Sequence, residues 1–318
     1  MKNILEIKNL NIGFKLDEQF VKAVHGVCLE LEKGKTLGIV GESGCGKSLT
    51  ATSIMKLLPS NAVIKSGEII FNGKNILKYS PKEIQNIRGN KIALIPQDPM
   101  TSLNPLYTIG DQISEVIELH QGLSKKEAKT VAIEALKKVK IPEAENRFND
   151  YPHQFSGGMR QRVIIAMALS CNPELLIADE PTTALDVTVQ AQILNLIRSI
   201  QEKYGTSLLL ITHDFGIIAE TCNHVAVMYA GRIVEHADIH SIFNNPAHPY
   251  TKGLMESLPT LKTKKLTAIK GQPPNITDNI NGCVFHPRCV YKKPVCENQE
   301  PDFDFVNNFH KVKCHFKF

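Results

Sequence analysis

The sequence lacks the apolar segments that would place a chain in or across a membrane. None of its apolar runs approaches the ~20 residues that a membrane-spanning helix needs, and Val163–Leu169 is among the longest. The first fourteen residues, MKNILEIKNLNIGF, alternate apolar and charged side chains and lack the apolar core of a signal peptide. We therefore expect a soluble, cytosolic protein.

An excess of charge is also lacking over most of the sequence. The net charge of +5 comes from Thr260–Phe318, which has ten Lys and Arg against five Asp and Glu, so residues 1–259 are balanced at 27 of each. A balanced body offers no large basic surface for a nucleic-acid backbone, so no nucleic-acid partner is expected. The basic tail could contact anionic lipid or RNA, although a solvated surface is the simpler interpretation.

Composition excludes a disordered or fibrous chain, because 42% hydrophobic and 22% charged residues are ordinary for a globular protein. A length of 318 residues suggests about two domains. No internal repeat is visible, and short apolar strands alternate with helical segments. The predicted strands are Leu5–Phe14, Val21–Leu31, Lys35–Val40, Glu68–Asn72, Lys91–Ile95, Leu175–Ala178, Ser207–Thr212, His224–Tyr229 and Arg232–Glu235. The predicted helices are Leu49–Leu58, Ile109–Leu119, Ser124–Val139, Met159–Ser170, Thr188–Tyr204 and Phe215–Thr221. This alternation predicts an α/β fold with a parallel, doubly wound sheet, and the first two strands predict an antiparallel β layer.

A glycine-rich turn between a predicted strand and a predicted helix carries the clearest chemical signal. Gly41–Ser48 reads GESGCGKS and fits the phosphate-binding pattern GxxxxGK[ST]. Its glycines let backbone N–H groups close around phosphates, and the helix N-terminus adds a partial positive charge. Lys47 is expected to reach the β- and γ-phosphates, and the Ser48 hydroxyl to ligate Mg²⁺. The residues expected to contact ATP here are Gly41, Ser43, Gly44, Cys45, Gly46, Lys47, Ser48 and Leu49.

Two carboxylates end a buried strand further along the chain. Leu175–Ala178 is apolar, and Asp179 and Glu180 follow it directly. A parallel sheet would bring this strand end beside the phosphate loop, where Asp179 can hold the magnesium shell. Glu180 is then placed to polarise a water molecule against the γ-phosphate, which makes it the expected catalytic base.

A third motif is more specific. Phe155–Arg162 reads FSGGMRQR, and Ser156 lies 23 residues before Asp179. Serine at a helix start is ordinarily a cap, but Ser-Gly-Gly also leaves backbone N–H groups exposed to an anion. The segment resembles the signature of ABC-type ATPases, from whose commonest form, LSGGQ, it departs at Phe155 and Met159. The resemblance implies that Ser156, Gly157 and Gly158 contact the γ-phosphate of an ATP held by an opposite subunit.

Other marks of that family occur in order. Gln97 resembles the Q-loop glutamine that ligates Mg²⁺ and senses the membrane subunits; Ala184-Leu185-Asp186 resembles the D-loop, with Asp186 facing across the dimer. His213 is similar to the switch histidine that contacts the γ-phosphate. An aromatic residue normally stacks on the adenine, and we expect Phe14 rather than Phe20. The resemblance implies a P-loop NTPase (RecA-like) core with an antiparallel β subdomain and a helical signature subdomain near residues 99–158.

The resemblance narrows toward one subfamily. Asn245–Leu254 reads NPAHPYTKGL and looks like the segment that begins the C-terminal extension of dipeptide, oligopeptide and nickel importer ATPases, although taken alone it could be an irregular surface turn. The motif FSGGM is similar to the signature motif of the first of the two paired ATPase subunits in that subfamily. The resemblance implies a heterodimer with a homologous second ATPase subunit, two transmembrane permease subunits and an extracytoplasmic peptide-binding protein, at the cytoplasmic face of the cell membrane.

Three functions follow from these motifs, and the first is favoured. It is ATP-driven import of dipeptides or oligopeptides; the same machinery could import nickel or a metal–chelator complex. A soluble ABC ATPase acting on nucleic acid is a more distant alternative. Such proteins commonly carry two cassettes or a long coiled-coil insertion, whereas this sequence has one signature motif and neither feature.

Four of the eight cysteines gather in the last 36 residues, namely Cys283, Cys289, Cys296 and Cys314. Disulfides are not expected in a cytosolic ATPase, and the spacing C-x5-C-x6-C-x17-C lacks the C-x2–4-C pair usual in zinc sites. Four thiolates can hold a [4Fe–4S] cluster, as the resemblance also implies, while zinc and unligated thiols remain alternatives. Nearby His286, His310 and His315 could substitute for a cysteine. We expect an ATP-binding domain over 1–258 and an extension over 259–318, which is too short to bury much core and would use a cluster as its staple.

Overall fold

The computed structural model describes residues 2–16, 19–183, 185–258, 268–307 and 309–316. Ala184 of the predicted D-loop and the start of the predicted extension at residue 259 lie outside these residues. The chain forms two compact units. The first is mainly Lys78–Leu210, with Glu32–Lys35; the second comprises Asn3–Leu31, Thr36–Leu77 and Ile211–Phe318.

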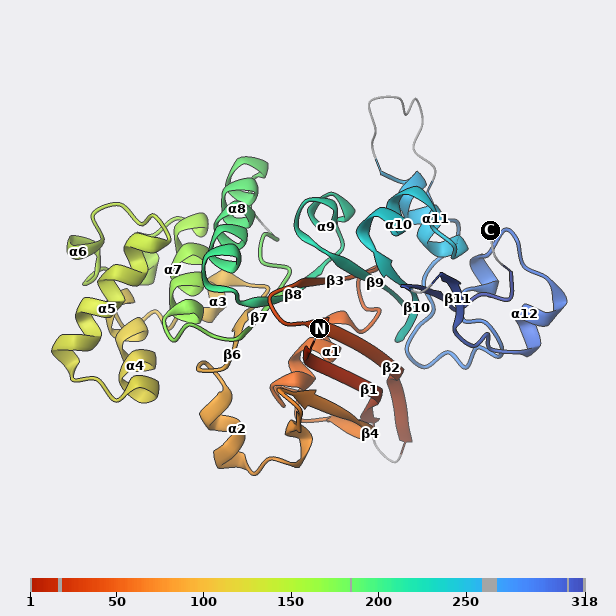
Figure 1. Cartoon of the computed structure of the whole chain (residues 1–318), viewed down its shortest axis with the longest axis horizontal. Helices are drawn as coiled ribbons and strands as arrows, with labels where there is room; N and C mark the ends of the chain where they lie inside the picture. The colour runs from red at the N-terminus through yellow and green to blue at the C-terminus, as the bar shows by residue number, and fades with distance from the viewer. Residues whose placement is uncertain (1, 17–18, 184, 259–267, 308, 317–318) are drawn as a thin grey trace. The chain divides into compact units, whose positions relative to one another are not determined.

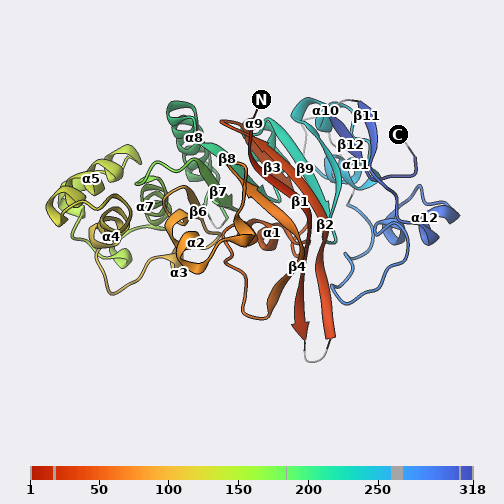
Figure 2. The ribbon, with the colours of Figure 1, turned by 60° about the horizontal axis from the view of Figure 1, so that its bottom comes forward.

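An antiparallel sheet in the second unit confirms the predicted β layer. Its strand order is β2-β1-β4-β5, and β1 pairs antiparallel with β4 (Figure 1, Figure 2). The strands are β1 (Asn3–Leu16), β2 (Gln19–Glu32), β4 (Ala62–Phe71) and β5 (Lys74–Asn75). β4 begins six residues before the predicted strand, because Ala62–Gly67 reads AVIKSG, which has no apolar–polar alternation yet continues the ladder with β1.

The second unit also holds one side of a larger sheet, in the order β11-β12-β10-β9-β3. These strands are β3 (Thr36–Val40), β9 (His224–Tyr229), β10 (Arg232–Asp238), β11 (Asp304–Asn307) and β12 (His310–Val312). β3 and β9 are parallel, but β9, β10, β12 and β11 are antiparallel to one another in turn. The prediction of a parallel sheet therefore holds for β3 and β9 but is wrong for the strands beyond β9. A tight turn causes the reversal, since Ala230 (φ 44°) and Gly231 (φ 76°) both adopt left-handed backbone between β9 and β10.

The helices of the second unit are short. They are α1 (Lys47–Ile54), η1 (Ile76–Lys78), α9 (Phe215–Thr221), α10 (Ile239–Asn244), α11 (Pro249–Glu256), η3 (His286–Arg288) and α12 (Pro294–Asn298). α1 ends four residues before the predicted Leu58, because Lys56 takes a left-handed φ of 52° ahead of Pro59.

The first unit is mainly helical. Its strands follow the order β8-β7-β6, where β6 (Ile92–Ile95) and β7 (Leu175–Asp179) are parallel and β8 (Ser207–Thr212) continues into the second unit. The helices are α2 (Pro81–Ile87), α3 (Pro99–Ser102), α4 (Ile109–Gln121), α5 (Lys125–Lys138), α6 (Ala144–Arg147), η2 (Pro152–Gln154), α7 (Gly157–Leu169) and α8 (Val187–Tyr204). Helices α4 and α5 pack on each other and on α7 (Figure 1). Among the described residues, no helix is long and apolar enough to cross a membrane.

Candidate nucleotide-binding site

The loop after β3 presents backbone amides at the start of α1. β3 is buried along its whole length, so it forms a rigid base for the loop. Gly44 (φ 78°) and Gly46 (φ 103°) adopt left-handed backbone, which costs glycine little. Gly46 is the N-cap of α1, and no side chain in the described part of the chain caps that helix end. Its first N–H groups are therefore suited to an anionic ligand.

Gly41 is required by close packing. A Cβ atom at this position would lie 2.1 Å from the carbonyl oxygen of Met228 and 2.9 Å from Sγ of Cys45. Strand β9, which contains Met228, thus packs directly against the loop at Gly41. Burial raises the pKa of the Cys45 thiol, so this cysteine acts as a small neutral packing group.

Lys47 is held inside the loop that precedes it. Its side chain is buried, and Nζ donates to the carbonyl oxygens of Gly41 at 2.8 Å and Glu42 at 3.0 Å. The third contact of Nζ is a weak one, 3.9 Å to Sγ of Cys45. A phosphate oxygen is a far better acceptor than a thiol, so it would displace that contact while both carbonyl bonds persist. Ser48 follows in the first turn of α1.

In the first unit, Gln97 and Glu180 lie within hydrogen-bond distance of each other. They follow the parallel strands β6 and β7, whose carboxyl ends lie at one edge of the sheet. The Gln97 amide Nε2 donates to Oε2 of Glu180 at 3.3 Å, and the Thr183 hydroxyl donates to the same oxygen at 2.9 Å. Asp179, the last residue of β7, is buried. Glu180 has a φ of 46°, a conformation that costs a non-glycine residue about 1–3 kcal/mol and is typical of functional sites.

The segment FSGG opens helix α7. Phe155 is buried, and Ser156 is the N-cap, whose Oγ accepts from the N–H of Met159 at 3.4 Å. A Cβ at Gly158 would lie 2.7 Å from Cγ1 of Val189 on α8, whereas one at Gly157 would meet nothing closer than 3.9 Å. Gly158 is therefore needed for helix packing, and Gly157 is free to serve another purpose.

The remaining predicted residues lie at the ends of elements. Asp186 is the N-cap of α8 and accepts from the N–H of Val189 at 2.9 Å. His213 is exposed and follows β8 directly. Phe14 is half-buried in β1, while the Phe20 ring packs over Gly13, where a Cβ would lie 2.5 Å from Cζ.

Comparison with known families identifies the chain. Residues 24–183 match the family described as "ABC transporter", and residues 234–296 match "Oligopeptide/dipeptide transporter, C-terminal region". The chain belongs to the ABC transporter family. It is thus an ABC-type ATPase, and the phosphate loop described above falls inside the first match.

Curated relatives resemble this ABC ATPase over nearly its whole length. The oligopeptide transport ATP-binding protein OppD of Bacillus subtilis is 52% identical over 98% of this chain and 88% of the relative. The dipeptide transport ATP-binding protein DppD of Bacillus subtilis is 49% identical over 99% of this chain and 95% of the relative. Among solved structures, the ATP-binding cassette MJ0796, a post-hydrolysis dimer bound to ADP and Pi, has a TM-score of 0.66 at 28% identity and covers 74% of this chain and 98% of its own.

The four tail cysteines of the ABC ATPase line one small cavity of about 10 Å³, together with His286 and His315. Cys283 is tied to Cys296 by a backbone hydrogen bond, N to O, of 2.8 Å. Burial raises the pKa of Cys283 to about 11 and also raises the pKa values of Cys289 and Cys314. All four are free thiols, and among the described residues no group of three or more His, Cys, Asp or Glu side chains is arranged to hold a metal ion.

Proposed function

We propose that this ABC ATPase couples ATP hydrolysis to the import of dipeptides or oligopeptides. The observation that carries the proposal is the combination of an ATPase body with a region over residues 234–296 described for oligopeptide and dipeptide transporters. Relatives named for oligopeptide and dipeptide transport align over 98% and 99% of the chain, which favours peptides over nickel or a metal chelate. The proposal divides the chain into an ATPase domain over 1–258, with a helical subdomain near 99–158, and an extension over 259–318.

The nucleotide-binding residues take the following roles in the proposal. The uncapped start of α1 and the Lys47 ammonium bind the phosphates of ATP, because both supply donors to an anion. Ser48, Gln97 and Asp179 would hold Mg²⁺, which prefers such oxygen donors and would neutralise charge on the phosphates. Glu180 positions the attacking water and accepts its proton, and His213 contacts the γ-phosphate. Phe14 stacks on the adenine.

A second ATPase subunit completes each site. Ser156 and Gly157 lie at the exposed start of α7, where backbone N–H groups and the helix dipole favour the γ-phosphate of an ATP on the opposite subunit. Gly158 and Asp186 position that helix end, through contacts with α8 and its cap. We propose that the opposite subunit is a homologous ATPase rather than a second copy of this chain.

A groove in the first unit is proposed to bind a transmembrane permease subunit. It has a volume of about 1170 Å³ and lies along α4, with Tyr107 and Leu119 in its wall. These side chains are 56% and 67% exposed, and neighbouring Leu106 is 80% exposed. Exposed apolar side chains beside a groove are typical of a protein interface. The complex would contain two permeases and an extracytoplasmic peptide-binding protein, with this chain peripheral at the cytoplasmic face of the membrane.

The cysteine cavity is proposed to hold a [4Fe–4S] cluster. The support for this proposal is that all four thiols line one cavity, since four thiolates are the donor set that such a cluster needs. Cys283, Cys289, Cys296 and Cys314 would be the ligands. Iron and acid-labile sulfide assays on anaerobically purified protein test this: about four of each per chain is expected, and a colourless, iron-free sample would reject the cluster.

Transport in membrane vesicles tests the main proposal. The chain is reconstituted with its second ATPase, permeases and binding protein, and uptake of a labelled dipeptide, a labelled pentapeptide and radioactive nickel is compared. ATP-dependent accumulation of a peptide is expected. Accumulation of nickel without either peptide would favour the alternative import function.

A further inference from the structure

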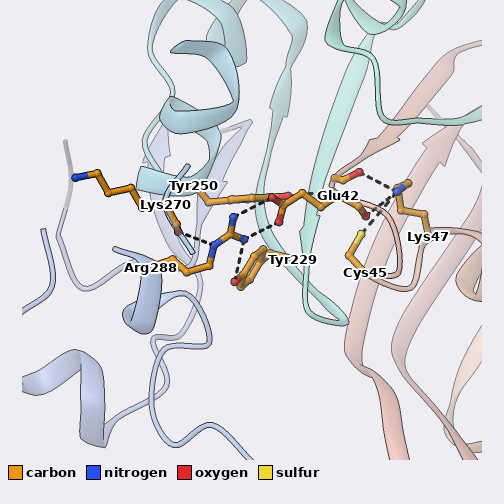
Figure 3. Close-up of polar contacts among 8 residues, drawn as sticks. Glu42, Cys45, Lys47, Tyr229, Tyr250, Lys270 and Arg288 are labelled. Atoms are coloured by element: carbon orange, nitrogen blue, oxygen red, sulfur yellow. Dashed lines mark hydrogen bonds and ion pairs between the residues drawn. The ribbon is translucent and has the colours of Figure 1, made fainter. Parts of the chain in front are cut away.

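Glu42, the second residue of the phosphate loop, has all three of its polar groups engaged (Figure 3). Its N–H donates to the hydroxyl oxygen of Tyr250 at 3.0 Å, and its carbonyl accepts from Nζ of Lys47 at 3.0 Å. Its carboxylate accepts from both terminal nitrogens of Arg288, at 2.7 Å and 3.0 Å. Glu42 therefore joins the C-terminal region to the lysine of the loop.

Arg288 is held in a single orientation. Its Nε donates to the carbonyl oxygen of Lys270 at 3.1 Å, while one terminal nitrogen also lies 3.4 Å from the Tyr229 hydroxyl. The Arg288 side chain is 5% exposed and that of Glu42 is 26% exposed. A two-pronged arginine–carboxylate pair with a buried guanidinium is stronger than an exposed ion pair and fixes the orientation of both side chains.

Aromatic rings surround this ion pair. The ring centroids of Tyr229 and Tyr250 are 4.6 Å apart, and Phe285 lies 5.2 Å from the first and 5.4 Å from the second. Arg288 lies 5.7 Å from the Tyr229 ring centre, and its guanidinium is almost fully buried. Low local polarity strengthens the attraction between the two charges.

We propose that Arg288 is a positioning residue for ATP binding. Arg288 holds Glu42, and the Glu42 carbonyl holds the Lys47 ammonium where phosphate would bind. The inference rests on the proposed role of Gly41–Ser48 as the phosphate loop. It assigns the C-terminal region an effect on nucleotide affinity, in addition to any role in stability.

A second ion pair provides a matched control. Glu300, also in the tail, accepts from Arg232 of β10 at 2.9 Å. Within the described part of the chain, the ion pairs of Glu300 are with Arg232 and Lys313 and not with the phosphate loop, although the pair with Arg232 also links the tail to the sheet. Loss of this pair therefore measures what weaker attachment of the tail does by itself.

The experiment compares R288Q, R288K, E42Q and E300Q in the full-length chain. Binding of a fluorescent ATP analogue is titrated, and KM and kcat for ATP are measured in the assembled transporter. R288Q and E42Q are expected to raise the Kd and KM for ATP about tenfold, while kcat stays within twofold of wild type. This effect is smaller than the full loss that can follow when one partner of a buried charge pair is removed. R288K keeps the charge without the two-pronged contact and should fall between R288Q and wild type, while E300Q should match wild type.

Two outcomes overturn the proposal. In the first, R288Q has a lowered melting temperature but the same KM as E300Q. This result would mean that the pair of Arg288 with Glu42 only attaches the tail. If R288Q fails to fold, unchanged KM in both R288K and E42Q has the same meaning. The K47A variant distinguishes failure of the phosphate-loop assignment from failure of the positioning role. If K47A still binds ATP, the assignment of Gly41–Ser48 as the phosphate loop is rejected. If K47A loses ATP binding while the KM of R288Q is unchanged, only the positioning role of Arg288 is rejected.

Discussion

The side-chain amide of Gln97 donates a hydrogen bond to the carboxylate of Glu180, with 3.3 Å between Nε2 and Oε2. The Thr183 hydroxyl donates to the same carboxylate oxygen. Two donors on one oxygen fix the orientation of the Glu180 carboxylate. The two residues come from loops 83 positions apart, so the contact connects the ends of two neighbouring strands.

Replacement of Glu180 by glutamine should abolish turnover but not ATP binding. E180Q keeps the size of the side chain and removes its ability to accept a proton, so hydrolysis should fall by about 100-fold or more. ATP analogue titration and phosphate release by the assembled transporter measure the two effects. T183A, which removes only a supporting donor, should lose less than about tenfold. Hydrolysis by E180Q at a near-normal rate would show that another group is the base.

The two signature glycines should respond differently to alanine. G158A places a methyl group against Val189, whose branched side chain cannot rotate away freely, so the free energy of unfolding should fall by about 1–3 kcal/mol. G157A meets only ordinary contact distances and should change it by less than about 1 kcal/mol. Urea unfolding of both variants measures the difference. V189A should restore stability to G158A; equal stabilities for G157A and G158A would contradict the packing argument.

Protonation of His236 should weaken the fold in mild acid. Burial, and then the nearby His224, Lys311 and His310, lower the pKa of His236 to about 4. Its Nε2 is buried without a hydrogen-bond partner among the described residues. Between pH 6.5 and pH 4 the unfolded chain therefore binds a proton that the folded chain does not, and the free energy of unfolding should fall by at most roughly 3 kcal/mol from this residue.

Urea unfolding at pH 7.5 and pH 5.0 checks the expected slope. Other buried histidines add to the total dependence, so the informative quantity is the difference between wild type and H236N. The variant should lose less stability on acidification than wild type does. Equal losses would mean that His236 titrates normally in the folded chain.

Glu235 should be among the most sensitive structural positions. It is fully buried, its Oε1 lies 2.6 Å from Nε2 of His310 on β12, and its oxygens also accept from the N–H groups of Ala247 and His248. Burial alone would raise the pKa of Glu235, but these hydrogen bonds hold it below its usual value. E235Q turns an NH₂ group toward N–H donors and should cost roughly 3 kcal/mol of stability. E297Q, at an exposed ion pair, should cost less than about 0.5 kcal/mol; equal melting temperatures would contradict this.

Local signals predicted much of the fold. Ser207–Thr212, Phe215–Thr221 and His224–Tyr229 have the predicted bounds, because apolar runs and caps define them within a few residues. β12 was not predicted, since its three residues are ordered by pairing with β10, some 75 positions earlier. Such long-range pairing leaves no periodic signal in a short segment.

Some features of the candidate site were likewise predictable from the sequence, and others were not. Motif spacing predicted the glycines of the phosphate loop and singled out Gln97 and Glu180 separately, because each motif carries its own chemistry. The hydrogen bond between Gln97 and Glu180 was not part of that prediction. Motif spacing also did not predict the left-handed backbone of Glu180, which the surrounding structure imposes. Nor did it predict the ion pair of Glu42 with Arg288, since a glutamate in a loop gives no indication of a partner near the other end of the chain.

The 246 positions between Glu42 and Arg288 have a consequence for how the protein matures during synthesis. At about 5–20 residues per second, a ribosome would make Arg288 roughly 12–50 s after Glu42. Throughout that interval the nascent phosphate loop has no guanidinium to hold it. High-affinity ATP binding would therefore arise late, when the tail has emerged, and an incomplete chain would compete poorly for nucleotide.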